Sequence, residues 1–277
     1  MIIVHDGKAH HDDFLATCFL IHKLNTRAIR TKFTEDHLND PEFWVIDQGL
    51  SHNPELHNFD HHHIKEEICA FTMVLDHFYG KEYRKSMPQL RFVEIFDSYG
   101  AKGAAKFFNT TEDVLEVCAS PISEAIIGVF SSISGEVNDP LYSIMKQMGK
   151  IICDKIENTE KLLSMIKNGV EIIECDSLKI LNIVNCKLEG IFKHENLPTK
   201  LYCKLNDIQA DVILSIDNRN GGYRMISNNT DILKFTQTDH SYFCHNSGFL
   251  TCFKNLNDYK SIISKAFNLR KQRMIDQ

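Results

Sequence analysis

The chain has 277 residues, of which 43% are hydrophobic and 25% are charged, and its formal net charge is −6. This composition is typical of a globular protein with one large or two medium domains. No apolar run approaches the roughly 20 residues of a membrane-spanning helix, and the N-terminus lacks a leader-like apolar stretch, so we expect a cytoplasmic protein without membrane association.

Nine cysteines are scattered along the chain without a Cys-x-x-Cys pair, which argues against a disulfide framework and against a structural zinc ribbon. Charge and histidine are unevenly distributed. The first half is acidic and holds most of the histidines, which suits cations, whereas the second half is mildly basic and suits an anionic substrate. The alternative, that these are only differently solvated surfaces, remains open at this point.

Residues 2–4, Ile-Ile-Val, predict a short buried strand that ends at the turn His5-Asp6-Gly7. The carboxylates of Asp12 and Asp13 predict the N-terminus of a helix that continues to Leu24. The next expected elements are a strand at 28–34, a strand at 43–46, a loop that carries the histidine-rich segment, and helices at 66–78, 90–105 and 121–133. The helix at 90–105 should be interrupted near Gly100 and Gly103.

A long helix is expected from residue 140 to about 167, closed by Asn168-Gly169. The elements expected after it are strands at 170–173, 178–184, 212–216 and 223–226, and a closing helix at 256–273 with a basic end. We therefore predict an α/β fold with a mostly parallel sheet in residues 1–139, a connecting helix at 140–169, and a smaller α+β domain in residues 170–277.

The segment from His57 to His63 concentrates four imidazoles and one carboxylate in seven residues. Imidazole and carboxylate together are ligands for transition metals, so this segment predicts part of a metal site. Ligands in parallel α/β sheets gather beyond the carboxyl ends of the strands. His5 and Asp47 each follow a predicted strand, which places them beside the histidine-rich segment.

The order of these motifs resembles the DHH phosphoesterase superfamily, named for an Asp-His-His sequence that is Asp60-His61-His62 here. The usual first motif, His-x-x-x-Asp-x-Asp, is replaced by His5-x4-His10-x-Asp12 followed by another aspartate. This variant is most similar to the branch of the melanocyte-proliferating-gene protein, a family of metal-dependent exonucleases. Phe59 before Asp60, and the segment from Val93 to Asp97, also match that branch.

The resemblance implies a DHH-type catalytic domain with two divalent metal ions. The implied ligands are His5, His10 and Asp47 for one ion, and Asp12, Asp47, His61 and Asp97 for the other. Asp47 would bridge the ions and serve catalysis together with His62, which would lie near the transferred phosphate. Histidine replaces the usual carboxylate at position 10, which favours Mn²⁺, and also Fe²⁺ or Co²⁺, over Mg²⁺. His11, His57 and His63 receive no role from the resemblance and either orient ligands or lie in solvent.

The resemblance also implies that the C-terminal domain binds substrate. The candidate residues there are Arg219, Gly221, Gly222, Arg224, His245 and Gly248. Arginine binds phosphate in a bidentate way and glycine permits close approach, whereas the two adjacent glycines alone would equally suit a hairpin turn. His245 to Phe249 matches the branch's His-x-x-Gly-Phe, but the Gly-Gly-Gly-His form of other superfamily members is absent.

Together these features predict a two-metal phosphodiesterase that hydrolyses short single-stranded RNA or DNA, with a 3′–5′ RNA exonuclease or oligoribonuclease as the leading form. The overall acidity argues against binding of long duplexes. Two alternatives stay open: a small-molecule phosphohydrolase acting on a cyclic dinucleotide, a nucleoside bisphosphate or pyrophosphate, and a non-enzymatic metal-dependent binding protein. The sequence leaves the oligomeric state open, including a homodimer.

Overall fold

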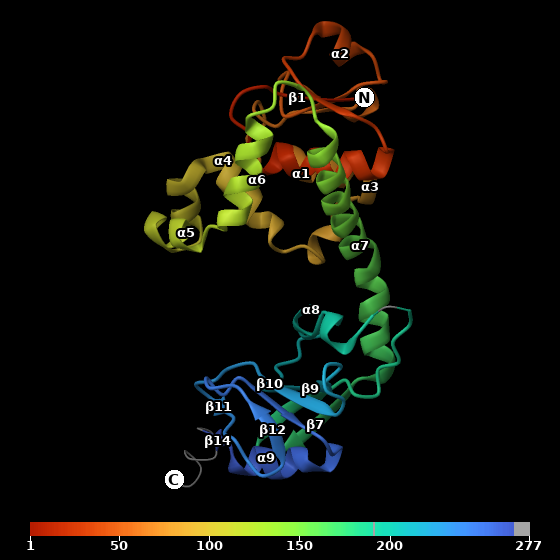
Figure 1. Ribbon diagram of the computed structural model, residues 1–277. Coiled ribbons are helices and arrows are strands. Elements are labelled where there is room, and N and C mark those ends of the chain that lie inside the picture. Colours follow the sequence, from red (N-terminus) through yellow and green to blue (C-terminus); the bar gives the residue numbers. More distant parts are fainter. Residues whose placement is uncertain (191, 269–277) are drawn as a thin grey trace. The chain divides into compact units, whose positions relative to one another are not determined.

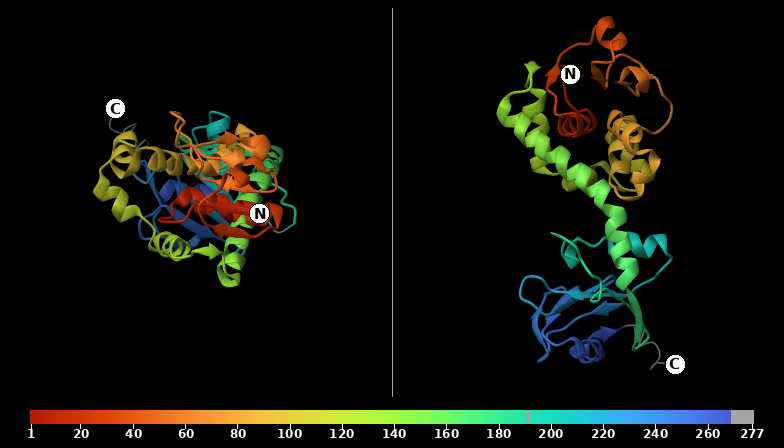
Figure 2. Two further views of the ribbon diagram at one scale, coloured as in Figure 1. Left: turned by 90° about the horizontal axis from the view of Figure 1, so that it is seen from above. Right: turned by 90° about the vertical axis from the view of Figure 1, so that its right-hand side faces the viewer.

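The computed structural model describes residues 1–190 and 192–268. The chain divides into two compact units, Met1–Glu157 and Asn158–Gln277. The boundary falls within one helix, α7 (Asp139–Gly169), which contributes its first part to one unit and its last part to the other (Figure 2). The observed bounds of α7 agree with the long helix expected from residue 140.

A six-stranded sheet with the order β4-β5-β3-β1-β2-β6 forms the centre of the first unit. Its strands are β1 (Ile2–Val4), β2 (Ala28–Arg30), β3 (Trp44–Ile46), β4 (His52–Asn53), β5 (Asn58–Phe59) and β6 (Gly135–Glu136). The four central strands pair in parallel, and β4 and β6 add antiparallel edges. The sheet is therefore mixed, with parallel pairing among its central strands and antiparallel pairing at both edges. β1 is apolar and fully buried, as is typical of a central parallel strand.

Helix α1 (His11–Leu24) packs against β1 and β3, and α3, α4, α6 and the first part of α7 pack around it (Figure 1). The other helices of this unit are α2 (Glu35–Asn39), α3 (Ala70–Tyr79), α4 (Leu90–Phe107), α5 (Glu112–Cys118) and α6 (Pro121–Ser131), with 3₁₀ turns at Pro54–Leu56 and Lys81–Lys85. α1 begins next to two carboxylates and ends at Asn25, which adopts a left-handed conformation with φ 50°. α4 is broken at Gly100, where φ is 66°, as the glycine predicted.

Three expectations for the first unit were wrong in part. The histidine-rich segment is not wholly a loop, because Asn58 and Phe59 form β5 beside β3. The strand expected at 28–34 ends at Arg30. The helix expected from residue 66 begins only at Ala70, since Cys69 is still extended and the preceding residues form turns that position His61.

The second unit contains another six-stranded sheet, with the order β12-β13-β10-β9-β8-β7. Its strands are β7 (Glu171–Cys175), β8 (Leu178–Asn182), β9 (Val212–Ile216), β10 (Tyr223–Ser227), β12 (Ser241–Cys244) and β13 (Leu250–Phe253). Only β8 and β9 pair in parallel. Helix α9 (Tyr259–Lys265) buries Ile262 and Ile263 against one face, and α8 (Thr199–Leu205) packs with the end of α7 against the other. 3₁₀ turns lie at His194–Asn196 and Leu256–Asp258.

The closing helix was predicted too long. It ends at Lys265, because Ala266 is extended and leads into β14 (Phe267–Asn268), which pairs with β11 (Leu233–Lys234). The rest of the predicted helix, from residue 269, lies outside the described residues. Within the described chain no single helix is long and apolar enough to cross a membrane, and only the bent pair α5 and α6, at 85°, reaches that length and composition together.

Candidate metal centre

Three neighbouring parallel strands deliver polar residues to one edge of the first sheet. Val4 lies opposite Ile46 in the ladder, and Ile46 lies opposite Phe59. The next residue on each strand is therefore at the same level of the sheet: His5 after β1, Asp47 after β3 and Asp60 after β5. The parallel register, which pairs residues distant in sequence, is what assembles this edge.

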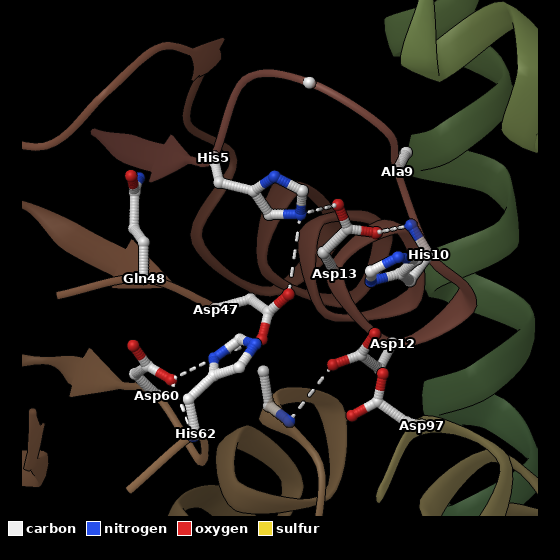
Figure 3. Close-up of polar contacts among 12 residues, drawn as sticks. His5, Ala9, His10, Asp12, Asp13, Asp47, Gln48, Asp60, His62 and Asp97 are labelled. Atoms are coloured by element: carbon white, nitrogen blue, oxygen red, sulfur yellow. Dashed lines mark hydrogen bonds and ion pairs between the residues drawn. The ribbon is translucent and has the colours of Figure 1, made fainter. Parts of the chain in front are cut away.

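His5 presents one ring nitrogen to two carboxylates. Its Nδ1 lies 2.7 Å from the carbonyl oxygen of Asp6, a contact that assigns the proton to Nδ1 and leaves Nε2 as the ligand atom. Nε2 lies 2.9 Å from Oδ2 of Asp13 and 3.5 Å from Oδ2 of Asp47 (Figure 3).

The first turn of α1 adds two fully buried carboxylates to the same place. Oδ1 of Asp13 accepts a hydrogen bond from the backbone N–H of His10 at 2.9 Å, which closes the turn before the helix. Oδ2 of Asp12 accepts one from the backbone N–H of Ala70, the first residue of α3, at 3.3 Å. Both aspartates are 0% exposed. Carboxylates at a helix N-terminus are favourable by themselves, but burial of two neighbouring ones needs a further cation.

Asp47 stands between two histidine contacts and has an unusual backbone. Its φ is 58°, in the left-handed region, which aspartate tolerates better than most residues. Its Oδ1 lies 3.3 Å from Nε2 of His61, and the same nitrogen lies 2.8 Å from Oδ2 of Asp97 on α4. Asp97 comes shortly before the break at Gly100, so α4 delivers it to the sheet edge from another part of the chain.

Three groups of side chains hold their ligand atoms within 4.8 Å of one another. They are His5, His10 and Asp47; Asp47, His61 and His62; and His10, Asp12 and Asp97. The first equals one of the two ligand sets implied by the resemblance. The other implied set is distributed over the remaining two groups. Asp47 and His10 each belong to two groups, and His62 is a further candidate ligand.

Buried polar atoms without a hydrogen-bond partner gather at this centre. Among the described residues they include His5 Nε2, Asp12 Oδ1, Asp13 Oδ2, Asp47 Oδ1, His61 Nε2 and Asp97 Oδ2. His5 and Asp13, and likewise His61 and Asp97, are within ion-pair distance, but their contacts lack the alignment of a hydrogen bond. Such atoms are costly unless something satisfies them. Divalent cations would satisfy the oxygen and nitrogen donors together, so the residues present fit a metal centre.

Burial and the neighbouring charges shift the pKa values of this cluster. Burial, with repulsion from Asp47, raises the pKa of Asp12 well above its ordinary value, and burial is also the main cause that raises the pKa of Asp47. The contact with Asp13 raises the pKa of His5 to about 9. Burial lowers the pKa of His61, but Asp47 and Asp97 outweigh it and raise the value to about 10.

These shifts predict that metal binding releases protons. Imidazoles with pKa values of about 9 and 10 are protonated at pH 7, and a metal ion binds only the neutral ring. Lower pH therefore favours the protonated histidines and weakens metal binding. The affinity for metal rises as the pH approaches the pKa values of His5 and His61. Calorimetric titration of Mn²⁺ into the metal-free protein, in buffers of different ionisation enthalpy at pH 7, should show release of about two protons. Metal binding with no proton transfer to the buffer would contradict this account of the site.

The carboxylate of Asp60 holds His62 through two hydrogen bonds. Its Nδ1 lies 2.6 Å from Oδ1 of Asp60, and its backbone N–H donates to the same oxygen at 2.9 Å. The backbone N–H of Leu50 donates to the other oxygen. Burial raises the pKa of Asp60, but these hydrogen bonds outweigh it, so the pKa lies below the ordinary value. The side chain of His62 remains half-exposed, with Nε2 as its second functional atom.

The three histidines without an assigned role differ in their surroundings. His57 stacks on Trp44 with ring centroids 4.0 Å apart, and its Nδ1 lies 2.7 Å from the carbonyl oxygen of Pro41. His11 contacts the hydroxyl of Ser123 on α6 at 2.8 Å. His63 is exposed. His57 is thus a structural residue of the sheet edge.

Sequence reasoning gave two residues that shape this centre no role at the metal site. One is Asp13, which was expected only at the N-terminus of the helix and whose Oδ2 lies 2.9 Å from Nε2 of His5. The other is Arg30 at the end of β2, which is 0% exposed. Its guanidinium donates to the carbonyl oxygens of His5 and Gly7 at 2.9–3.2 Å and also to that of Phe130. Arg30 thereby fixes the turn that carries His5, a contact across the sheet that no local pattern indicates.

The candidate substrate residues of the second unit do not form one cluster. Arg219, Gly221 and Gly222 belong to the turn between β9 and β10, next to Phe253. His245 and Gly248 belong to the turn between β12 and β13, next to the other end of β10.

The glycines and Arg224 have structural surroundings in this unit. A Cβ on Gly222 would lie 2.5 Å from the carbonyl oxygen of Phe253, so the tight turn between β9 and β10 requires this glycine. Arg224 lies along β10, with Nε bonded to the hydroxyl of Ser215 at 2.9 Å and Nη1 3.7 Å from Glu195.

Comparison with known proteins adds little to this geometry. No protein family model and no curated protein matches the chain. Among solved structures, the chain is similar to the pGpG-specific phosphodiesterase PggH from Vibrio cholerae, with 12% sequence identity, a TM-score of 0.28, and coverage of 100% of this chain and 99% of that chain. A TM-score this low does not establish a shared fold, so the function must be argued from the residues of the site.

Proposed function

We propose that this protein is a DHH-type phosphodiesterase that uses two divalent metal ions to hydrolyse short single-stranded nucleic acid. The observation that supports this proposal best is the convergence of His5, His10, Asp12, Asp47, His61 and Asp97 from four separate segments onto one sheet edge. Each of these residues except the exposed His10 has a buried atom without a hydrogen-bond partner. A merely structural polar cluster would be expected to satisfy these atoms internally.

The ligand chemistry supports a pair of ions with Asp47 between them. Oδ2 of Asp47 faces His5, whereas Oδ1 faces His61, so its two oxygens point to different ligand groups. The mixture of imidazole and carboxylate favours Mn²⁺, with Fe²⁺ and Co²⁺ as close alternatives and Mg²⁺ as the weakest match. When bound, two such ions supply positive charge that polarises a phosphoryl group and lowers the pKa of water.

His62 and Asp60 are proposed to handle the proton of the leaving group. The carboxylate of Asp60 accepts a hydrogen bond from Nδ1–H of His62 and keeps the ring in one orientation. Nε2 of the half-exposed ring can then hold a proton and donate it to a leaving oxygen. An imidazole held in this way also contributes positive charge near a phosphate.

The composition supports a short substrate. The net charge of −6 disfavours long duplexes, which require a broad basic surface. We therefore propose an exonuclease or oligoribonuclease that removes nucleotides from the 3′ end of RNA, with the second unit contributing contacts to the substrate.

The test is incubation of a 5′-labelled five-nucleotide RNA with the protein and Mn²⁺. The expected result is a ladder of products that shorten by one nucleotide, and no cleavage after chelation with EDTA. DNA of the same sequence, a cyclic dinucleotide and pyrophosphate are run in parallel. Turnover of one of these small phosphate compounds without any RNA ladder would refute the exonuclease proposal in favour of a small-molecule phosphohydrolase.

A matched pair of variants separates the protein's own activity from a contaminating nuclease. His62→Gln removes the proposed proton donor and should reduce cleavage about a hundredfold or more. His63→Gln changes the exposed neighbour and should leave cleavage unchanged. Equal activity of both variants and wild type would identify the nuclease as a contaminant.

A further inference from the structure

The second unit contains a cavity of about 390 Å³ lined by Arg219, Asn220, Tyr242, Phe243 and Cys252. It lies where the turn between β9 and β10 meets the beginning of β12. The His245–Gly248 turn, which carries the family resemblance, lies at the other end of β10 and lines no part of this cavity. The cavity is therefore a separate feature of this chain, large enough for a mononucleotide.

A buried carboxylate fixes the side chains that face this cavity. Asp217 is 0% exposed, and its Oδ1 accepts hydrogen bonds from the backbone N–H of Arg219 at 3.1 Å and from Nε of Arg219 at 3.2 Å. Its Oδ2 accepts one from the hydroxyl of Tyr242 at 2.5 Å. Asp217 engages Nε, and Nη2 makes one weak contact, with Sγ of Cys252 at 4.0 Å, so the terminal groups can still reach a ligand on a side chain that is 56% exposed.

These contacts prepare the guanidinium for an anion. An arginine held through Nε has lost much of its rotamer freedom and presents two parallel N–H groups that match two phosphate oxygens. Lys254 adds a second positive charge nearby, since its Nζ donates to the carbonyl oxygens of Asn220 and Gly221 at 2.7 and 3.2 Å. Arg219 and Lys254 thus place two positive charges beside the buried carboxylate of Asp217, and Glu195 adds a further negative charge near Arg219.

Two aromatic rings complete the cavity. Tyr242 and Phe243 are 38% and 42% exposed, although the cavity is in a unit with its own apolar core. Lys254 lies 5.0 Å from the centre of the Tyr242 ring and so steadies that ring by a cation–π contact. The ring of Phe243 has no such contact among the described residues. Exposed aromatic faces next to cationic groups are a common arrangement for stacking nucleic-acid bases.

We propose that this cavity binds a nucleoside monophosphate unit, with the phosphate on Nη1 and Nη2 of Arg219 and the base stacked on Phe243. The unit is either a free nucleotide or the phosphorylated end of a short oligonucleotide, which share this chemistry. Binding requires neither the metal centre nor hydrolysis. It therefore constitutes a ligand site beyond the proposed phosphodiesterase site.

The test is calorimetric titration of the full-length protein in EDTA, with guanosine monophosphate, guanosine and inorganic phosphate as separate ligands. The nucleotide should bind more tightly than either fragment. Arg219→Lys, which keeps a charge beside Asp217 but loses the fork, and Phe243→Ala should each weaken nucleotide binding about tenfold or more. In Arg219→Lys the affinity for guanosine monophosphate should fall toward the affinity for guanosine. A simple loss of folding would instead weaken binding of both ligands equally.

The matched controls are Lys234→Gln, which changes an exposed cation near the opposite end of β10, and Ile172→Ala, which changes an exposed apolar side chain on β7 at the other edge of the sheet. Both should bind the nucleotide like wild type. A 5′-phosphorylated dinucleotide forms the second arm. If the dinucleotide also binds, and if Arg219→Lys weakens that binding to the same extent, the ligand is the terminal nucleotide of an oligonucleotide. If only the mononucleotide binds, the ligand is a free nucleotide. Either supports the site.

Absence of nucleotide binding by the wild type would overturn the proposal, as would a loss caused equally by Ile172→Ala. Because no metal is present, failure of this test leaves the hydrolase proposal standing. Failure to detect hydrolysis likewise leaves this site untouched.

Discussion

Asp47→Ala is expected to lower metal-dependent hydrolysis of a short oligonucleotide by at least about 10³-fold. The two oxygens of Asp47 face His5 and His61 separately, so this residue connects the two ligand groups. Without it, each group loses a ligand and the pair of ions loses its shared carboxylate. The rate should be measured with saturating Mn²⁺, together with the metal content of the purified variant.

Asp47→Asn is the variant that separates charge from backbone strain. Asparagine tolerates the left-handed conformation at φ 58°, whereas alanine pays a cost of roughly 1–2 kcal/mol there. In EDTA, Asp47→Asn should unfold at a higher temperature than wild type, because it removes one of several crowded buried carboxylates. Added Mn²⁺ should stabilise wild type by about 2.7 kcal/mol at a hundredfold excess over Kd and should stabilise the variant less.

Asp40→Ala, at an exposed position after α2, is the control and should behave like wild type. Retention of near-normal hydrolysis by Asp47→Asn would show that Asp47 does not bridge metal ions. Loss of hydrolysis that is matched by unfolding in EDTA would point to a structural role instead.

Gly149→Ala is expected to destabilise the first unit by about 2 kcal/mol or more, although alanine normally favours a helix. At Gly149 the backbone of α7 lies directly against α1. A Cβ there would lie 2.1 Å from the carbonyl oxygen of Cys18 and 2.7 Å from Cβ of His22. An added methyl group fits only if α7 moves away from α1. That movement would weaken the packing of α1, whose first turn carries Asp12 and Asp13.

Gly128→Ala in α6 is the matched control, because a Cβ there meets nothing within 4 Å. This change should stabilise the protein by about 0.5–1 kcal/mol. Urea unfolding followed by the fluorescence of Trp44, the single tryptophan, reports on the first unit specifically. Equal stability of Gly149→Ala and wild type would mean that the helix crossing has more room than the backbone contacts indicate.

Local patterns predicted the elements whose physical causes are local. Ile2–Val4 is β-branched and buried, α1 starts at its carboxylates, α4 breaks at Gly100, and α7 ends at its glycine. β5 was missed because two residues carry no detectable periodicity, and it exists only through pairing with β3. The turns and the short edge strands were missed for the same reason.

The candidate ligands were predicted in two different ways. His5 and Asp47 followed from the rule that parallel strands deliver ligands at their carboxyl ends. The division of ligands between two ions followed only from the family resemblance, and it remains a proposal. The structure places the candidate substrate residues Arg219 and His245 at opposite ends of β10. Sequence spacing does not reveal which end of a strand a turn occupies until the strand order is known.

The sequence by itself determined which side chains are available for chemistry and roughly where strands and helices begin. Imidazoles and carboxylates are conspicuous in a chain because they are costly to bury. Only the tertiary structure decided which of them meet. The register that sets His5, Asp47 and Asp60 side by side, the Arg30 contacts across the sheet and the anchoring of Arg219 by Asp217 all join residues through packing and pairing. Such contacts depend on the whole folded chain, because their energies come from burial that no single segment achieves alone.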